Sequence, residues 1–405
     1  MRHLLTVFIF VFGYFSTCEA ATSEVPEPFQ GFDDASRYTI NYDDLTNILK
    51  VAVVDVGHST REKAAPTHAA TGTRMKTSVK RSTINEGNRF YYETFAENED
   101  GRKLLIAIQK SLEQVPAEAP LKYFTRDEQL AYWLNLYNVT VLNEIIKAYP
   151  QRSLKKLVTG KDSIFSKKIL NVAGLPLSLD DIEYTILKNN YNGDPLIIYG
   201  LYQGYIGGPN IRKRAYTGSD VWRALKNNAN EFINSNRGTY PKDEKTFRVS
   251  SLYERNKAFF PDFSDDLTKH LMTYIEGEER SELQSASAVR ADIDDWTVTD
   301  LGGTYRDFGA MFADNNAALL DSVKSTVAAD GGGTIAASAG AGSTALAGAG
   351  KPLQRFDPEL LAHLTIINER REATNQKNAN VTMEELGEAP VKPKPDSEAE
   401  QKDHD

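Results

Sequence analysis

The chain has 405 residues, of which 40% are hydrophobic, so it is long enough for one large domain or two ordinary ones. Its formal net charge of −9 argues against a nucleic-acid-binding protein, because such proteins carry a basic surface. Cys18 is its single cysteine, which excludes a disulfide within the chain.

The first twenty residues have the pattern of a cleavable export signal. Arg2 and His3 form a short polar segment, an apolar run extends from Leu4 to Phe15, and small residues typical of a cleavage site end at Ala20. The apolar run is shorter than the roughly 20 residues that span a bilayer, which disfavours a membrane anchor. We therefore predict a signal peptide over residues 1–20.

Cleavage after Ala20 would remove Cys18 from the mature chain. A thiolate nucleophile and a cysteine–metal site are then both excluded. We expect an exported protein, periplasmic if the source is a Gram-negative bacterium and otherwise extracellular. No later stretch of the sequence is long and apolar enough to predict a transmembrane helix.

The first predicted elements follow a polar leader over residues 21–42. Residues 43–56 have the pattern of a helix that continues into an extended segment, and residues 101–114 predict a helix. The clearest element begins at Thr125, which forms a capping box with Glu128. Apolar residues then recur at helical spacing until Pro150, which predicts a buried helix.

The next elements alternate between short strands and helices. Ala173 and Gly174 indicate the turn of a hairpin, and Ser178 can cap the helix that follows. Residues 195–201 are rich in β-branched and aromatic residues, so we predict a buried strand there. The remaining predictions are a helix after Ser219, a strand over 247–252 and a helix from Ser264.

The C-terminal part of the chain has a different composition. Residues 280–327 form an extension without a defined pattern. Residues 328–350 are almost wholly Ala, Gly, Ser and Thr, and residues from 384 onward are acidic and contain proline, so we predict that 328–405 are disordered. The predicted fold is a single α+β domain over residues 43–279, mostly helical around a small β-sheet, with a disordered tail.

Three polar side chains lie among the apolar residues of the predicted helices. Asn135 and Asn138 share a face of the central helix, where asparagine is unfavourable unless its amide has definite hydrogen-bond partners. Glu183 lies at the edge of an apolar stripe, where burial would raise its pKa toward the range of a general acid. The alternative is structural: the amides tie the helix to backbone, and an arginine or backbone N–H groups satisfy the carboxylate.

A glycine-rich segment follows the predicted strand and precedes three basic residues. Its backbone N–H groups and the nearby guanidinium groups could hold a carboxylate or a phosphate. The candidate ligand-binding residues are Gln203, Gly204, Gly207, Gly208, Arg212 and Arg214. The segment matches neither the dinucleotide-binding pattern nor the P-loop, so it predicts no cofactor. The alternative is a tight connection beside a solvated basic patch.

Histidine is scarce in this sequence. No two of the six histidines have metal-ligand spacing, so we expect no metal site. His270 lies off the apolar face of its helix, which predicts a surface position. His58, in a predicted loop, is the one histidine that we consider for catalysis. A serine–histidine–acid triad stays open, although no G-x-S-x-G motif is present.

The order of these motifs resembles the family known as domain of unknown function 547. The matching runs are 128–138 (EQLAYWLNLYN), 177–183 (LSLDDIE), 199–209 and 249–263 (VSSLYERNKAFFPDF). Many members of that family have histidine after the isoleucine–glutamate pair and cysteine in the loop after the buried strand. This chain has Tyr184 and Gln203 there, so the resemblance implies a branch without either group.

These observations favour a non-catalytic binding or scaffold module of the cell envelope. Its partner would be an envelope protein or a small anionic ligand, bound by the segment around Gly204 to Arg214. The alternative is a hydrolase or transferase that uses Glu183 as acid or base, helped by Asn135 and Asn138. An enzyme should expose Glu183 in a cleft, whereas a sealed Glu183 paired with arginine argues against catalysis.

Overall fold

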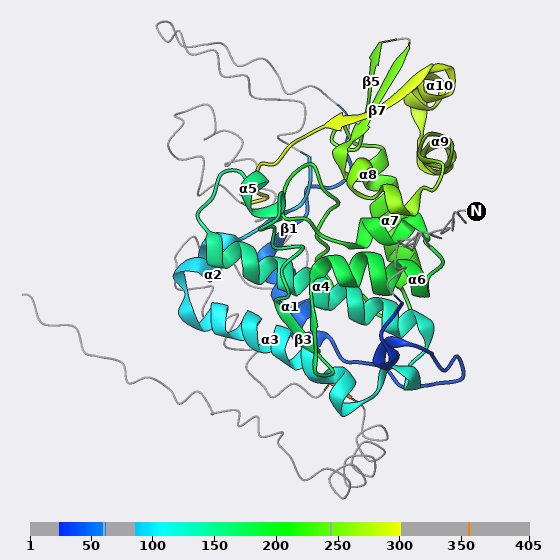
Figure 1. Ribbon diagram of the computed structural model, residues 1–405. Coiled ribbons are helices and arrows are strands. Elements are labelled where there is room, and N and C mark those ends of the chain that lie inside the picture. Colours follow the sequence, from blue (N-terminus) through cyan, green and yellow to red (C-terminus); the bar gives the residue numbers. More distant parts are fainter. Residues whose placement is uncertain (1–23, 60, 62–85, 244, 301–354, 357–405) are drawn as a thin grey trace, which may run out of the picture. The chain divides into compact units, whose positions relative to one another are not determined.

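The computed structural model describes residues 24–59, 61, 86–243, 245–300 and 355–356 (Figure 1). The predicted signal peptide and nearly all of the predicted tail lie outside these residues. The described part is mostly helical with small sheets of two or three strands, which confirms the α+β class. None of its helices is long and apolar enough to cross a membrane.

Helix α4 (Arg126–Ala148) is the central element of the helical part (Figure 1). It contacts α2 (Tyr92–Glu97), α3 (Glu99–Glu118) and α7 (Val221–Ile233), so most of its residues are buried. The predicted cap at Thr125 is confirmed, because its hydroxyl accepts from the backbone N–H of Glu128 at 3.2 Å. The Glu128 carboxylate accepts instead from two distant backbone N–H groups, which ties two other segments to the start of α4.

Several shorter elements surround α4. Helix α1 (Asp43–Ala52) continues into strand β1 (Val53–Val54), as predicted, and β1 pairs antiparallel with β2 (Arg89–Phe90). The remaining helices are η1 (Glu27–Phe29), η2 (Leu121–Tyr123), α5 (Lys155–Val158), η3 (Asp181–Leu187), α6 (Lys188–Asn190), η4 (Pro195–Gly200), α8 (Ser251–Arg255), η5 (Lys257–Phe259), α9 (Phe263–Tyr274) and α10 (Gly277–Ser285).

The predicted hairpin is present as strands β3 (Leu170–Val172) and β4 (Leu175–Leu177). Its two turn residues have positive φ angles of 51° at Ala173 and 80° at Gly174, as a tight two-residue turn requires. The Ser178 hydroxyl accepts from the backbone N–H of Asp181 at 3.1 Å, which confirms the predicted cap of the next helix. That helix begins as the π-helical segment η3.

The prediction of a buried strand over residues 195–201 is wrong. The segment is the 3₁₀ helix η4, which starts at Pro195 and is capped by Asp194, whose carboxylate accepts from the N–H of Leu196 at 2.9 Å. The β-branched and aromatic residues correctly indicate burial, since the segment packs against α7 and Ile197 to Tyr199 are inaccessible. Burial without a partner strand leaves the backbone to satisfy its hydrogen bonds locally.

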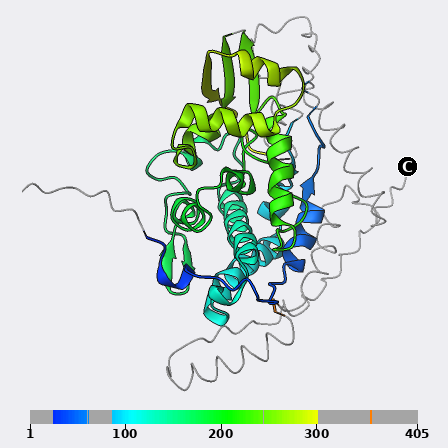
Figure 2. The ribbon, with the colours of Figure 1, turned by 90° about the vertical axis from the view of Figure 1, so that its right-hand side faces the viewer.

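The largest sheet has the strand order β5–β6–β7, and its strands are the arrows at the top of Figure 2. Strand β6 (Thr246–Ser250), predicted as 247–252, pairs antiparallel with β5 (Thr239–Asp243) and parallel with β7 (Ala288–Ile293). Helix α8 leads directly out of β6 and contacts β7. The sheet therefore fixes the position of the residue that ends α8, Arg255.

The described core reaches beyond the predicted limits of residues 43 and 279. Phe29 and Val298 are fully buried. Arg355 and Phe356, which fall inside the predicted tail, are each 4% exposed. Segments that lack a periodic apolar pattern in the sequence thus contribute individual buried side chains to the core.

Candidate functional site

Asn135 and Asn138 of α4 each clamp the backbone of a distant segment. The Asn135 amide donates to the carbonyl of Tyr216 at 2.8 Å and accepts from the N–H of the same residue at 2.8 Å. The Asn138 amide donates to the carbonyl of Gly200 at 2.9 Å and accepts from the N–H of Tyr202 at 2.8 Å. Each amide makes one donated and one accepted hydrogen bond to backbone, as expected if the two asparagines tie the helix to backbone.

These clamps hold the glycine-rich segment in the interior of the domain. Residues 199–211 are all buried, with Gly204 in a left-handed conformation at φ 79°. A Cβ atom at Gly204 would overlap the side chain of Ile145, and one at Gly207 would lie 3.1 Å from backbone atoms of Asp295. The glycines thus allow close packing, and the N–H groups of Gly207 and Gly208 donate to the carbonyls of Asp295 and Tyr205.

Gln203, Glu183 and Arg255 form a buried polar cluster. Arg255 donates through Nη2 to Glu183 Oε2 at 2.9 Å and through Nη1 to Gln203 Oε1 at 2.9 Å. Tyr184 donates to the backbone carbonyl of Arg255 at 3.1 Å. Gln203 and Tyr184 therefore both contact one arginine. No sequence pattern singled out Arg255, although it lies in the fourth matching run.

The surroundings of Glu183 determine its protonation chemistry. Its side chain is fully buried, and burial raises the pKa of the carboxyl group above its ordinary value, while the Arg255 guanidinium opposes that rise. Tyr137 also donates toward Glu183 Oε2, at 3.5 Å. Asp180 is a second, partly exposed carboxylate, 3.2 Å from Arg255 Nη2. Arg255 also lies over the ring of Phe165, 3.9 Å from its centroid, which covers the cluster further.

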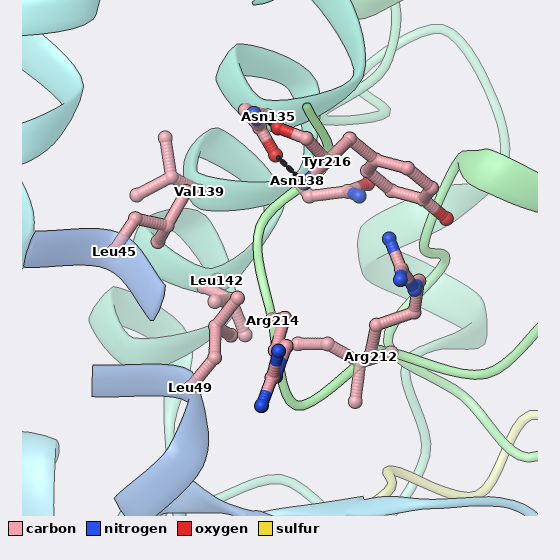
Figure 3. Close-up of a pocket in the computed structure, with 10 residues that line it drawn as sticks. Leu45, Leu49, Asn135, Asn138, Val139, Leu142, Arg212, Arg214 and Tyr216 are labelled. Atoms are coloured by element: carbon pink, nitrogen blue, oxygen red, sulfur yellow. Dashed lines mark hydrogen bonds between the residues drawn. The ribbon is translucent and has the colours of Figure 1, made fainter. Parts of the chain in front are cut away.

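A hollow lies between α1, α4 and the segment after the glycines (Figure 3). Its volume is about 280 Å³, including the part open to solvent. The apolar lining comes from Leu45, Leu49, Val139, Leu142 and Ile211, and the polar lining from Asn135, Asn138, Arg212, Arg214 and Tyr216. Each predicted set is therefore divided between two places. Glu183 and Gln203 meet at Arg255, whereas the hollow is lined by Asn135, Asn138, Arg212 and Arg214.

The two arginines of the hollow differ in their contacts. Arg212 lies 4.6 Å from the centroid of the Tyr216 ring and contacts Asp220 at 3.4 Å, which fixes the side chain. Its Nη1 is buried and has no hydrogen-bond partner among the described residues. Arg214 is exposed, and no described residue pairs with its guanidinium group. The hollow thus offers unneutralised positive charge beside an aliphatic wall.

Two histidines, His58 and His270, are among the described residues, and neither lines the hollow. His58 is exposed. The surface position expected for His270 is wrong, because this side chain is largely covered and its Nε2 lies 2.9 Å from the hydroxyl of Tyr199. Burial lowers the pKa of His270 to about 4, so its ring is neutral at pH 7. Among the described residues, no group of three or more acidic, histidine or cysteine side chains is placed to hold a metal ion.

Comparisons with known proteins identify the segment that carries this geometry. No curated protein and no solved structure matches the chain. The family model described as "Protein of unknown function, DUF547" matches residues 121–233, a segment that runs from η2 through α7 and includes both asparagine clamps, Glu183 and Gln203. The match confirms the resemblance over residues 121–233, while the fourth run at 249–263 lies outside it.

Proposed function

We propose that this protein is a non-catalytic binding module, and that the hollow lined by Arg212 and Arg214 binds a carboxylate attached to a short aliphatic group. The observation that carries the proposal is the free charge of Arg214 opposite Leu45 and Leu49. A guanidinium group binds a carboxylate through charge-assisted hydrogen bonds, and the leucines favour an apolar neighbour. The ligand class is thus a small acid or the C-terminal residue of an envelope protein.

The dimensions of the hollow limit what can bind. Its volume of about 280 Å³ includes space that is open to solvent, so the hollow is a shallow depression that encloses little space. One aliphatic side chain with its carboxylate can rest against such a surface, whereas a long acyl chain would stay mostly uncovered. The fixed geometry of Arg212 against Tyr216 also reduces the entropy lost when a ligand is bound.

The covering of Glu183 supports a non-catalytic role over the alternative of a hydrolase or transferase. A general acid must come within hydrogen-bond distance of its substrate. The Glu183 side chain is fully buried and paired with Arg255, and Asn138 lies at the hollow instead. We therefore assign the cluster to structural stabilisation and the hollow to binding.

Titration calorimetry with two matched probes tests this proposal. N-acetyl-leucine and N-acetyl-leucinamide share an aliphatic side chain and differ in the charge of one end. A charge-assisted hydrogen bond of about 1.5–3 kcal/mol corresponds to an affinity for the acid that is roughly 10-fold or more higher. Equal affinities for the acid and the amide would overturn the assignment of the charge.

Two variants locate the binding site. Arg214→Met puts an uncharged, apolar side chain in place of the guanidinium group, so it should abolish the preference for the acid. Lys213→Met removes a neighbouring charge that does not line the hollow, and it should leave the preference intact. Undiminished acid binding by Arg214→Met would place the site elsewhere.

We also propose that the protein works outside the cytoplasm, since residues 1–20 have the pattern of an export signal. N-terminal sequencing of the protein from its native cells should then begin at Ala21. Recovery of a mature protein that retains Met1 would contradict export through a cleaved signal.

A further inference from the structure

Arg355 is buried against α1, although more than 300 residues separate it from that helix in the sequence. Its guanidinium group forms a two-pronged ion pair with Asp44, in which Nη2 lies 2.8 Å from Oδ2 and Nη1 lies 3.2 Å from Oδ1. The Asp44 side chain is fully buried, and that of Arg355 is 4% exposed. The pair is therefore part of the interior of the domain.

Further hydrogen bonds fix the direction of the chain at Arg355. Its Nη1 donates to the carbonyl of Asn41 at 2.8 Å and its Nε donates to the hydroxyl of Ser111 at 2.8 Å. The backbone N–H of Asn41 donates back to the carbonyl of Arg355 at 2.5 Å. All three guanidinium nitrogens thus have partners, from two different segments of the chain.

The neighbouring residue, Phe356, adds an apolar contact. It is 4% exposed, and its ring centroid lies 6.3 Å from that of Phe124, at an interplanar angle of 32°. Phe124 follows η2 and is fully buried. We refer to Asn41, Asp44, Ser111 and Phe124 together as the Arg–Phe socket.

We propose that Arg355 and Phe356 act as a latch that ties the C-terminal segment to the Arg–Phe socket. The socket selects this pair because a carboxylate matches the planar fork of arginine in two places, which the point charge of lysine cannot reproduce. The latch also joins α1 to α3, since Asp44 and Asn41 lie at the start of α1 and Ser111 lies on α3. Its withdrawal leaves the Asp44 carboxylate without its cation, so release of the latch is coupled to opening of the start of α1.

Hydrogen exchange in the full mature chain tests the latch locally. In the native protein, the amide of Asn41 should exchange slowly, because it donates to Arg355. The variant Arg355→Gln should lose at least about 10-fold of that protection, while amides in the middle of α4 keep theirs. Arg290→Gln, which removes a 60% exposed arginine side chain, is the matched control and should change neither region.

A peptide experiment then tests recognition in the variant Arg355→Gln. A synthetic peptide with the sequence of residues 351–360 (KPLQRFDPEL) should restore protection at Asn41. The same peptide with glutamine in place of its arginine, or with lysine there, should restore much less. Unchanged protection of Asn41 in Arg355→Gln overturns the latch, and equal effects of the three peptides overturn selective recognition by the socket.

Discussion

The Arg255 guanidinium lies 2.9 Å from the Glu183 carboxylate, and this ion pair joins two helices whose starts are about 70 residues apart. Glu183 is inaccessible to solvent, whereas the Arg255 side chain keeps 23% of its exposure. The arginine therefore separates a buried carboxylate from solvent. Gln203, Tyr184 and Asp180 also contact the arginine, so the pair organises the whole cluster.

Substituting Arg255 with methionine should destabilise the protein strongly. The change leaves the Glu183 charge buried without a cation, and breaking a buried pair in this way costs about 3–5 kcal/mol. The double variant Arg255→Met, Glu183→Gln removes both charges and should recover part of that loss. Urea unfolding measures both free energies, and a double variant no more stable than Arg255→Met would contradict this account.

The same substitution should change how stability depends on pH. Burial raises the pKa of Glu183, and removal of Arg255 takes away the interaction that opposes this rise. A carboxyl group with a raised pKa in the folded state gives stability that is present below its unfolded pKa and is lost as the pH rises through its folded pKa. Relative to wild type, Arg255→Met should thus regain stability as the pH falls from 7 toward the unfolded pKa. An unchanged difference across that range would contradict the prediction.

His270 should make the protein sensitive to mild acid. Burial lowers the pKa of His270 to about 4, below the ordinary value of about 6.5. The folded state thus resists protonation between these values, so the stability due to neutral His270 is present above pH 6.5 and is lost as the pH falls toward 4. The variant His270→Gln can keep a hydrogen bond to Tyr199 and should flatten the pH dependence of the urea midpoint in this window. His58→Gln, at an exposed position, is the control and should leave it unchanged.

Alanine at Gly204 should be much worse than alanine at another glycine of similar conformation. Gly204 has a φ angle of 79° and a Cβ there would overlap Ile145, whereas Gly174 has a φ angle of 80° and open space around it. Gly174→Ala then measures the cost of the conformation alone, and the excess for Gly204→Ala measures the overlap, typically about 1–3 kcal/mol for an overpacked core. Equal losses in urea unfolding would show that packing against Ile145 does not matter.

Removing the asparagine clamps should destabilise the glycine-rich segment. Asn135→Ala leaves the N–H and the carbonyl of Tyr216 without their partner, and each unsatisfied buried group costs about 1–3 kcal/mol. Asn138→Ala should have a similar effect through Gly200 and Tyr202. Asn171→Ala, at an exposed position of β3, is the control for loss of an amide and should change the urea midpoint little. A loss as small as that of the control would argue against the clamps.

Much of the local structure could be predicted because its causes lie close together in the sequence. The cap at Thr125, the turn at Ala173 and Gly174, and the cap at Ser178 depend on hydrogen bonds and backbone angles within a few residues. Apolar periodicity likewise located α4, since a helix of that length must bury a continuous surface. The presence of two asparagines on that helix correctly suggested amides with definite partners.

The rest depended on contacts between distant segments. The composition of residues 195–201 indicated burial, but it did not distinguish a buried strand from the 3₁₀ helix η4 that packs against α7. Neither the convergence of Gln203 and Tyr184 on Arg255 nor the docking of Arg355 on Asp44 leaves a periodic signal in the sequence, since each rests on one side chain.

The sequence by itself determined that a mature chain cleaved after Ala20 has no thiol, because Cys18 is the single cysteine. Only the tertiary structure decided which charged side chains are buried and which stay in contact with solvent. It buries Glu183 behind Arg255 and leaves Arg214 exposed beside Leu45 and Leu49, because packing determines which charges lose solvent and which keep it.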